Sequence, residues 1–181
     1  MDYSLDELSA SELKLYNSIS KNLNFGDDQL EVDGTYERYR NLHANYFQLL
    51  TTTFDENIKL EALKRLVFLN WYSYTEPSIF TGIESLKNEI VFNSYSILND
   101  YIRADKLDEE LEWMLKFYAS WDWAILDFSE NRLSELTKFV KTVDTSISTY
   151  PKRQLPQGIM SNRGQMGLYW SSMQVEIEDN R

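Results

Sequence analysis

His43 is the only histidine in the chain, and it lies in a row of aromatic and aliphatic residues. The row has the spacing of one helix face over residues 35–52, and its other members are Tyr36, Tyr39, Phe47 and Leu50. An imidazole can act as a base or a metal ligand. In an apolar row it is more often packed and hydrogen-bonded to a carbonyl or hydroxyl, and we favour that interpretation. A metal site would need carboxylates from other helices, and the Glu-x-x-His pairs of di-iron bundles are missing.

Two more polar residues stand inside apolar stretches. Asn70 belongs to LVFLNWYSY, residues 66–74, which contains no charged residue. A buried asparagine must bond to a neighbouring group or cost stability, so Asn70 is either a structural clamp to a neighbouring backbone or a pocket-lining group, and we favour the clamp. Asp122 flanks the apolar face of a predicted helix at 107–128. We therefore expect Asp122 to be largely buried and paired with an arginine, lysine or tyrosine of another helix.

Acidic residues exceed basic ones, with 29 Asp and Glu against 18 Lys and Arg and a net charge of −11. Asp108, Glu109 and Glu112 gather at the predicted start of a helix, where the helix dipole favours negative charge. This charge balance repels a phosphate backbone and attracts a basic partner, although solubility alone would also explain it. Trp123 lies on the polar face of the same predicted helix. It is either covered by another segment or offered to a partner.

Motifs that perform chemistry are missing from the sequence. It has no cysteine, no Gly-rich phosphate loop, no paired-histidine metal motif and no Gly-x-Ser-x-Gly elbow. We therefore predict no cofactor and lean against catalysis. The expected function is that of a soluble protein-binding module that captures a basic protein, of which an immunity or antitoxin-like role is one instance. The alternative is a small-ligand-binding protein or enzyme with an aromatic pocket between helices, near His43, Asn70 and Asp122.

Helical periodicity and repeated capping boxes predict the elements that would position these residues. The predicted helices cover residues 4–23, 35–52, 53–74, 81–102, 107–128 and 129–147. Only six glycines and three prolines occur, which suits long helices. The stretch 107–128 is apolar over most of its circumference and is predicted to be the central helix. The sequence thus predicts an all-α, single-domain bundle of five to six long helices.

The C-terminal residues differ from the rest in composition. Residues 148–181 hold two of the three prolines and three of the six glycines, so we expect an irregular segment packed on a bundle formed by residues 1–147. Tyr169 and Trp170 would dock it. The pattern at 166–177 fits either a short helix or a strand. Covering Trp123 is one possible role of this segment.

The N-terminal residues 1–14 are acidic and lack the basic and apolar regions of a signal peptide. No apolar run is long enough to cross a membrane. Together with the lack of cysteine, these features predict a cytoplasmic protein that does not bind membranes. The net charge of −11 disfavours nucleic acids as partners.

Overall fold

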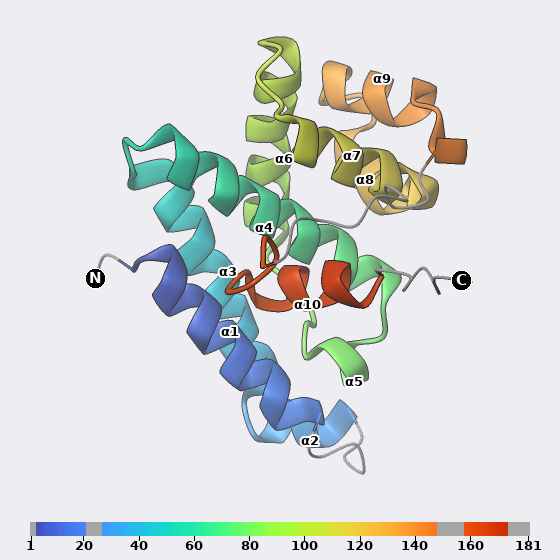
Figure 1. Cartoon of the computed structure of the whole chain (residues 1–181). Coiled ribbons are helices and arrows are strands. Elements are labelled where there is room, and N and C mark those ends of the chain that lie inside the picture. The colour runs from blue at the N-terminus through green and yellow to red at the C-terminus, as the bar shows by residue number, and fades with distance from the viewer. Residues whose placement is uncertain (1–2, 21–26, 148–157, 174–181) are drawn as a thin grey trace, which may run out of the picture.

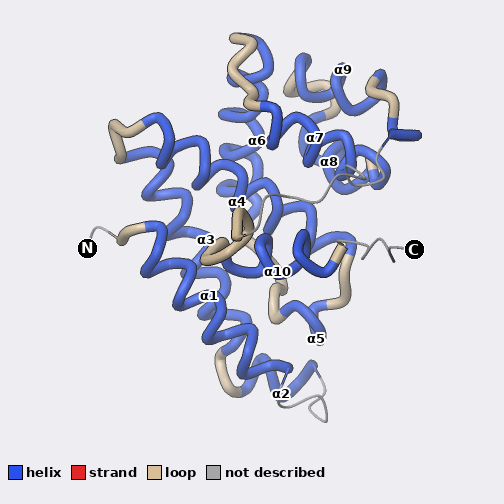
Figure 2. The backbone as a smooth tube through the Cα atoms, in the orientation of Figure 1, coloured by secondary structure: helices blue, strands red, loops and turns tan. Residues whose placement is uncertain are grey.

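Helices form all of the regular structure in the described part of the chain, which covers residues 3–20, 27–147 and 158–173 of a computed structural model (Figure 2). No strand occurs in these residues, and the prediction of an all-α single-domain bundle is confirmed. The α-helices are α1 (Leu5–Ser20), α2 (Asp27–Val32), α3 (Thr35–Thr52), α4 (Glu56–Thr75), α5 (Ser78–Thr81), α6 (Asn88–Arg103), α7 (Glu109–Tyr118), α8 (Trp123–Ser129), α9 (Ser134–Thr142) and α10 (Gly164–Ser172). Short 3-10 turns cover Ala119–Trp121 and Thr145–Ile147.

The centre of the bundle is α4, in which every residue from Ala62 to Trp71 is buried. It packs against α3, α5, α6, α8 and α10. In Figure 1 it runs through the middle of the molecule, with α1, α2 and α3 on one side and α6, α8 and α9 on the other. A helix that is covered on so many sides has no solvent-facing side and therefore needs no polar face. The polar residues inside its buried part, Lys64, Arg65 and Asn70, must instead find partners within the protein.

The prediction of one central helix at 107–128 is wrong. The chain forms α7 up to Tyr118, a 3-10 turn at Ala119–Trp121, and then α8 from Trp123. A 3-10 turn has about 3 residues per turn, so it changes the direction in which the following side chains point. Tyr118 before the turn and Ile125 after it are both buried, whereas Trp121 and Asp122 between them are exposed.

The start of α1 agrees with the helix predicted from residue 4, whereas α4 begins at Glu56, capped by Asp55, and not at the predicted residue 53. In the predicted capping box at the start of α1, the Glu7 backbone N–H donates to Ser4 Oγ (3.3 Å), and the Ser4 backbone N–H donates to Glu7 Oε2 (2.8 Å). The predicted start at Thr81 is wrong, because α5 ends there. Gly82 follows with a φ of 72°, a left-handed conformation that favours glycine, and α6 begins only at Asn88.

The start of α9 depends on a residue from another helix. We predicted a helix over 129–147, whereas α9 covers only Ser134–Thr142. The Asn99 side chain, from α6, accepts hydrogen bonds from the backbone N–H groups of Glu135 (2.9 Å) and Leu136 (3.1 Å). The first backbone N–H groups of a helix have no carbonyl partner within that helix. The Asn99 side-chain amide supplies the missing acceptor and so stabilises the start of α9.

The C-terminal segment is partly helical. α10 packs against α1 and α4, so the strand alternative for 166–177 is wrong for the residues up to Met173. Trp170 is buried and Tyr169 is partly buried against the core, which confirms that these rings dock on the bundle. Residues 148–157 and 174–181 lie outside the described part. The division of the chain after residue 147 stays a prediction.

Candidate functional site

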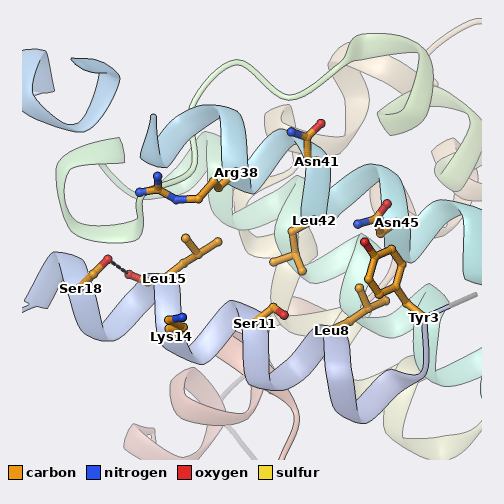
Figure 3. Close-up of a pocket in the computed structure, with 10 residues that line it drawn as sticks. All are labelled: Tyr3, Leu8, Ser11, Lys14, Leu15, Ser18, Arg38, Asn41, Leu42 and Asn45. Carbon is orange, nitrogen blue, oxygen red and sulfur yellow. Dashed lines mark hydrogen bonds between the residues drawn. The ribbon is translucent and has the colours of Figure 1, made fainter. Parts of the chain in front are cut away.

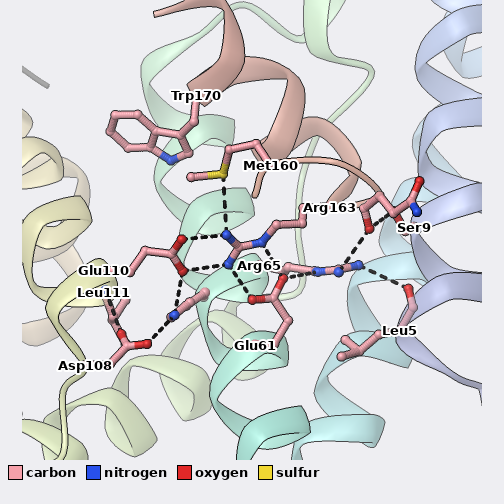
Figure 4. A network of polar contacts seen from close by, with 12 residues as sticks. Leu5, Ser9, Glu61, Arg65, Asp108, Glu110, Leu111, Met160, Arg163 and Trp170 are labelled. Atoms are coloured by element: carbon pink, nitrogen blue, oxygen red, sulfur yellow. Dashed lines mark hydrogen bonds and ion pairs between the residues drawn. The ribbon is translucent and has the colours of Figure 1, made fainter. Parts of the chain in front are cut away.

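A buried group of charged side chains joins the C-terminal segment to the rest of the bundle (Figure 4). Arg163 Nε donates to Glu61 Oε1 at 2.8 Å, and its two terminal nitrogens donate to the Glu110 carboxylate at 2.7 and 2.8 Å. Lys64 Nζ adds a second cation, 2.6 Å from Glu110 Oε2, and also binds Asp108. Burial would raise the pKa of Glu110, but the hydrogen bonds from Arg163 and Lys64 outweigh it and lower that pKa.

A second polar group adjoins the first and is centred on Glu12 of α1, which is only 1% exposed. Its carboxylate accepts hydrogen bonds from the Tyr46 hydroxyl (2.8 Å) and from the backbone N–H of Gln165 (2.8 Å). Burial raises the pKa of Glu12 to about 7, although these hydrogen bonds and the charge of Arg65 oppose the shift. Gly164 has a φ of 58°, and a Cβ there would lie 2.0 Å from Glu12 Oε2. Glycine is therefore required where the chain passes over the carboxylate.

Sequence reasoning recognised only part of these two groups. Glu12 interrupts the apolar face of the first predicted helix, but no sequence pattern assigns it a role. The pairing of Arg163 with Glu61 and Glu110 joins residues far apart in the chain, and no local pattern indicates it. Because every one of these charges has an internal partner, the two groups hold the C-terminal segment in place and offer no obvious position for a substrate.

His43 and Asn70 lie together, as structural groups. His43 Nε2 and Asn70 Oδ1 are 2.8 Å apart, and Asn70 Nδ2 donates to Ser94 Oγ at 2.7 Å. Since the amide oxygen can only accept, the neutral imidazole carries its proton on Nε2, and Nδ1 finds no partner in the described residues. Burial lowers the pKa of His43 to about 4. This geometry agrees with the packed imidazole that the sequence favoured. Asn70 is bonded within the core, as expected, but its partners are the side chains of His43 and Ser94 and not a neighbouring backbone.

Asp122 is exposed, so the prediction that it is largely buried is wrong. The 3-10 turn at Ala119–Trp121 brings Asp122 to the surface at the start of α8, where its side chain makes no capping hydrogen bond. It therefore does not join His43 and Asn70 in one pocket. The exposure follows from the break in the helix, because Asp122 flanks the apolar face only if residues 107–128 form one continuous helix.

The acidic residues around the start of α7 are largely engaged within the protein. Asp108 caps α7 by accepting from the Leu111 backbone N–H at 2.8 Å, and it also pairs with Lys64. Glu112 pairs with Lys116 at 2.6 Å, whereas Glu109 is exposed. The binding role of Asp108, Glu109 and Glu112 stays a prediction, and a change at Asp108 would disturb the fold itself.

An exposed surface that combines aromatic rings with acids lies beside the last turns of α4. We call it the aromatic–acidic surface, and it consists of Tyr74, Trp121, Asp122, Trp123 and Asp127, all exposed. Trp123 is 45% exposed, and its ring meets Tyr74 edge-on with centroids 6.4 Å apart. Trp121 packs on buried Trp71, one turn before Tyr74. Burial and the charge of Asp127 raise the pKa of Tyr74, which indicates that the carboxylate lies near its hydroxyl.

Trp123 remains exposed in the presence of α10. The rings of that helix lie elsewhere, with Trp170 edge-on to Trp113 at 4.5 Å and Tyr169 edge-on to Trp71 at 5.6 Å. The described part of the C-terminal segment thus leaves Trp123 accessible. Trp121 and Tyr74 were not singled out in advance, because their exposure depends on how the turn after α7 meets α4.

The described part of the surface also includes a groove and a smaller hollow. A groove of about 550 Å³ lies between α1 and α3 (Figure 3), with leucines at its floor and the polar side chains Lys14, Arg38, Asn41 and Asn45 along its sides. A smaller hollow of about 290 Å³ lies where α1, α4 and α10 meet. Neither hollow is lined by His43, Asn70 or Asp122.

Comparison of the chain with protein-family models, with curated proteins and with solved structures finds no match. Within the described ranges, no group of three or more His, Asp and Glu side chains is placed to hold a metal ion. None of the helices in those ranges combines the length and apolar character needed to cross a membrane. The geometry and charge of this chain are therefore the only basis for a proposed function.

Proposed function

We propose that this protein binds a basic protein partner through the aromatic–acidic surface. The observation that carries the proposal is the exposure of Trp121 and Trp123 beside Asp122 and Asp127 on a chain of net charge −11. Tryptophan and tyrosine supply most of the binding free energy in many interfaces, and they lose little conformational entropy when they bind. The surrounding carboxylates would attract Lys and Arg of the partner and speed the encounter.

This surface is a better candidate than the acids at the start of α7. Asp108 and Glu112 already have cationic partners, so their charge is partly neutralised. Asp122 and Asp127 are exposed beside large rings, which combines a charge for steering with an apolar anchor. An immunity or antitoxin-like role remains one instance of such a function. A cytoplasmic location and the lack of a nucleic-acid partner also remain predictions, supported by composition and charge.

Binding of a small ligand is the second candidate function. The groove between α1 and α3 favours it, because polar side chains from both helices line an apolar floor (Figure 3). The aromatic pocket expected around His43 does not support it, since His43 and Asn70 bond to each other.

The test compares capture of partners from a native extract by the full chain and by variants. Trp123→Ala should lower the affinity of a captured basic protein by about 30-fold, the loss typical of a central aromatic anchor. Phe54→Ala is the matched control, because Phe54 is 96% exposed but lies beyond the opposite end of α4, about 30 Å away for a helix of that length. It should bind like the unaltered protein.

The electrostatic part of the proposal has its own measurement. Changing Asp122 and Asp127 together to asparagine should slow association at low salt and make the rate less dependent on salt. A captured partner that is acidic, or one that binds equally well to Trp123→Ala and to the control, would contradict the proposal.

A further inference from the structure

The groove between α1 and α3 is basic, although the protein as a whole is acidic. Its charged lining residues are Lys14 of α1 and Arg38 of α3, and no carboxylate occurs among the described residues that line it. The whole chain has 29 acidic against 18 basic residues, so the charge of this lining is opposite in sign to the net charge of −11. The groove therefore favours an anion, whereas the protein as a whole attracts cations.

The two ends of the groove differ in chemistry. Because α1 and α3 run in opposite directions, Arg38 near the start of α3 lies opposite the part of α1 that contains Lys14 (Figure 3). Tyr3 and Asn45 lie at the other end, away from both cations (Figure 3). The leucines of the floor, two of which are almost fully buried, are Leu8, Leu15 and Leu42. The groove thus joins a cationic end to an apolar floor.

The two cations differ in how far they are already neutralised. Lys14 is exposed and forms no ion pair within the described part of the chain. Arg38 Nη1 donates to the Asp33 carbonyl oxygen (2.7 Å), and its Nη2 donates to Thr35 Oγ1 (3.0 Å) and lies 3.6 Å from the Asp33 carboxylate. These bonds hold the guanidinium in place, and Asp33 offsets part of its charge. Lys14 therefore supplies most of the positive potential, and one negative charge on a ligand balances it.

We propose that this groove binds a straight-chain fatty acid of medium length as its carboxylate. The carboxylate accepts hydrogen bonds from Lys14 Nζ and lies near Arg38, while the alkyl chain runs along the leucines towards Tyr3. Six residues of helix separate Lys14 from Leu8, a rise of about 9 Å that a chain of about eight carbons spans. The inference rests on the second candidate function, binding of a small ligand in this groove, and it is independent of the aromatic–acidic surface.

The experiment is an NMR titration of the full chain, which follows backbone amide resonances at neutral pH and constant ionic strength. The probes are octanoate, octylammonium and uncharged octanol, each below the concentration at which it forms aggregates. We expect octanoate to shift the amides of Ser11, Lys14 and Leu42 in a saturable manner. Octanol should bind more weakly, and octylammonium should bind most weakly in the groove, although the net charge of the protein attracts it. Leu168, which lines the separate hollow at α10, should not respond to octanoate.

The same titration separates failure of this inference from failure of ligand binding in the groove. If octanol or octylammonium binds there as tightly as octanoate, the groove accepts amphiphiles but its cations do not select among them. That result overturns the inference and leaves the second candidate function standing. If none of the three probes shifts the groove amides, the inference is overturned together with the main support for the second candidate function.

Two further measurements test the head and the tail of the ligand separately. Affinity should rise by about two- to fourfold for each methylene from butanoate to octanoate, because each buried methylene adds hydrophobic free energy. Lys14→Gln should lower the affinity for octanoate by about two- to fivefold, the range of an exposed ion pair, and should leave that for octanol unchanged. Arg40→Gln is the matched control, because Arg40 pairs with Glu37 on α3 and does not line the groove. It removes the same charge and should bind octanoate like the unaltered protein. Equal losses in the two variants, or full affinity in a folded Lys14→Gln protein, would overturn the proposal.

Discussion

Glu12 and His43 are buried titratable groups whose effects on stability oppose each other between pH 4.5 and 6.5. Burial raises the pKa of Glu12 from 4.5 to about 7 and lowers the pKa of His43 from 6.5 to about 4. Between pH 4.5 and 7 the folded protein holds a proton on Glu12 that the unfolded chain releases, so stability falls as pH rises. Between pH 4 and 6.5 the unfolded chain protonates His43 and the folded protein does not, so stability rises with pH.

Each pKa shift changes the free energy of unfolding by about 3 kcal/mol across its pH range, at about 1.4 kcal/mol per pKa unit. The two effects should therefore nearly cancel in the unaltered protein over the pH range in which they overlap. Replacing Glu12 with Gln removes one of them. The glutamine carbonyl can still accept from the Gln165 backbone N–H, as Glu12 Oε1 does at 2.8 Å. Any other effect of the substitution on the free energy of unfolding is independent of pH. It therefore does not alter how the stability difference between the two proteins changes with pH.

The assay is urea unfolding of the unaltered protein and of Glu12→Gln at several pH values from 4.5 to 8. From pH 4.5 to pH 8, the stability of Glu12→Gln relative to the unaltered protein should rise by about 3 kcal/mol. In thermal unfolding this corresponds to a relative change in Tm of about 6–12 °C for a chain of this size. Glu31→Gln is the control, because Glu31 is exposed on α2, and it should show no such change.

The result that would refute this reasoning is a stability difference between the unaltered protein and Glu12→Gln that stays constant over the whole pH range. Glu12 would then titrate in the folded protein as it does in the unfolded chain. Burial in the hydrogen-bonded group around Tyr46 and Gln165 would not be the controlling effect.

Two further predictions concern the buried contacts that hold the fold. Arg163→Met should destabilise the protein by about 3 kcal/mol in urea unfolding, since it leaves the partly buried carboxylates of Glu61 and Glu110 without one cation, whereas Lys141→Ala at an exposed pair should cost less than about 1 kcal/mol. Similar losses for both variants would contradict the importance of burial. Asn70→Leu should lower the free energy of unfolding by about 1–3 kcal/mol, because it removes the acceptor of the His43 N–H, whereas Asn41→Leu at an exposed position should leave it nearly unchanged. An Asn70→Leu protein as stable as the unaltered one would argue against the clamp.

Local patterns in the sequence were sufficient for the class of fold and for several of its elements. The row that contains His43 predicted α3 with the bounds that the structure has, and the helix predicted from residue 4 begins within one residue of α1. The packed state of His43 was also predictable. These features depend on residues within one or two turns of each other, where helical geometry determines which side chains meet.

Features that depend on residues far apart in the chain were predicted poorly. The break between α7 and α8 exposed Asp122, and the start of α9 depends on Asn99 of another helix. The pairing of Arg163 with Glu61 joins α4 to the segment before α10. No short pattern encodes such contacts, because they form only when the chain has folded.

The sequence by itself determined that this is an acidic, all-helical bundle with a large aromatic core, because apolar periodicity and composition are properties of the chain alone. Tertiary structure decided which acids remain available at the surface and which pair internally. It also decided that Trp123 stays exposed and that the buried Gln165 side chain has an amide oxygen without a hydrogen-bond partner among the described residues. The physical reason is that burial and pairing are set by neighbours from other helices, whereas helix formation is set mainly by residues nearby in sequence.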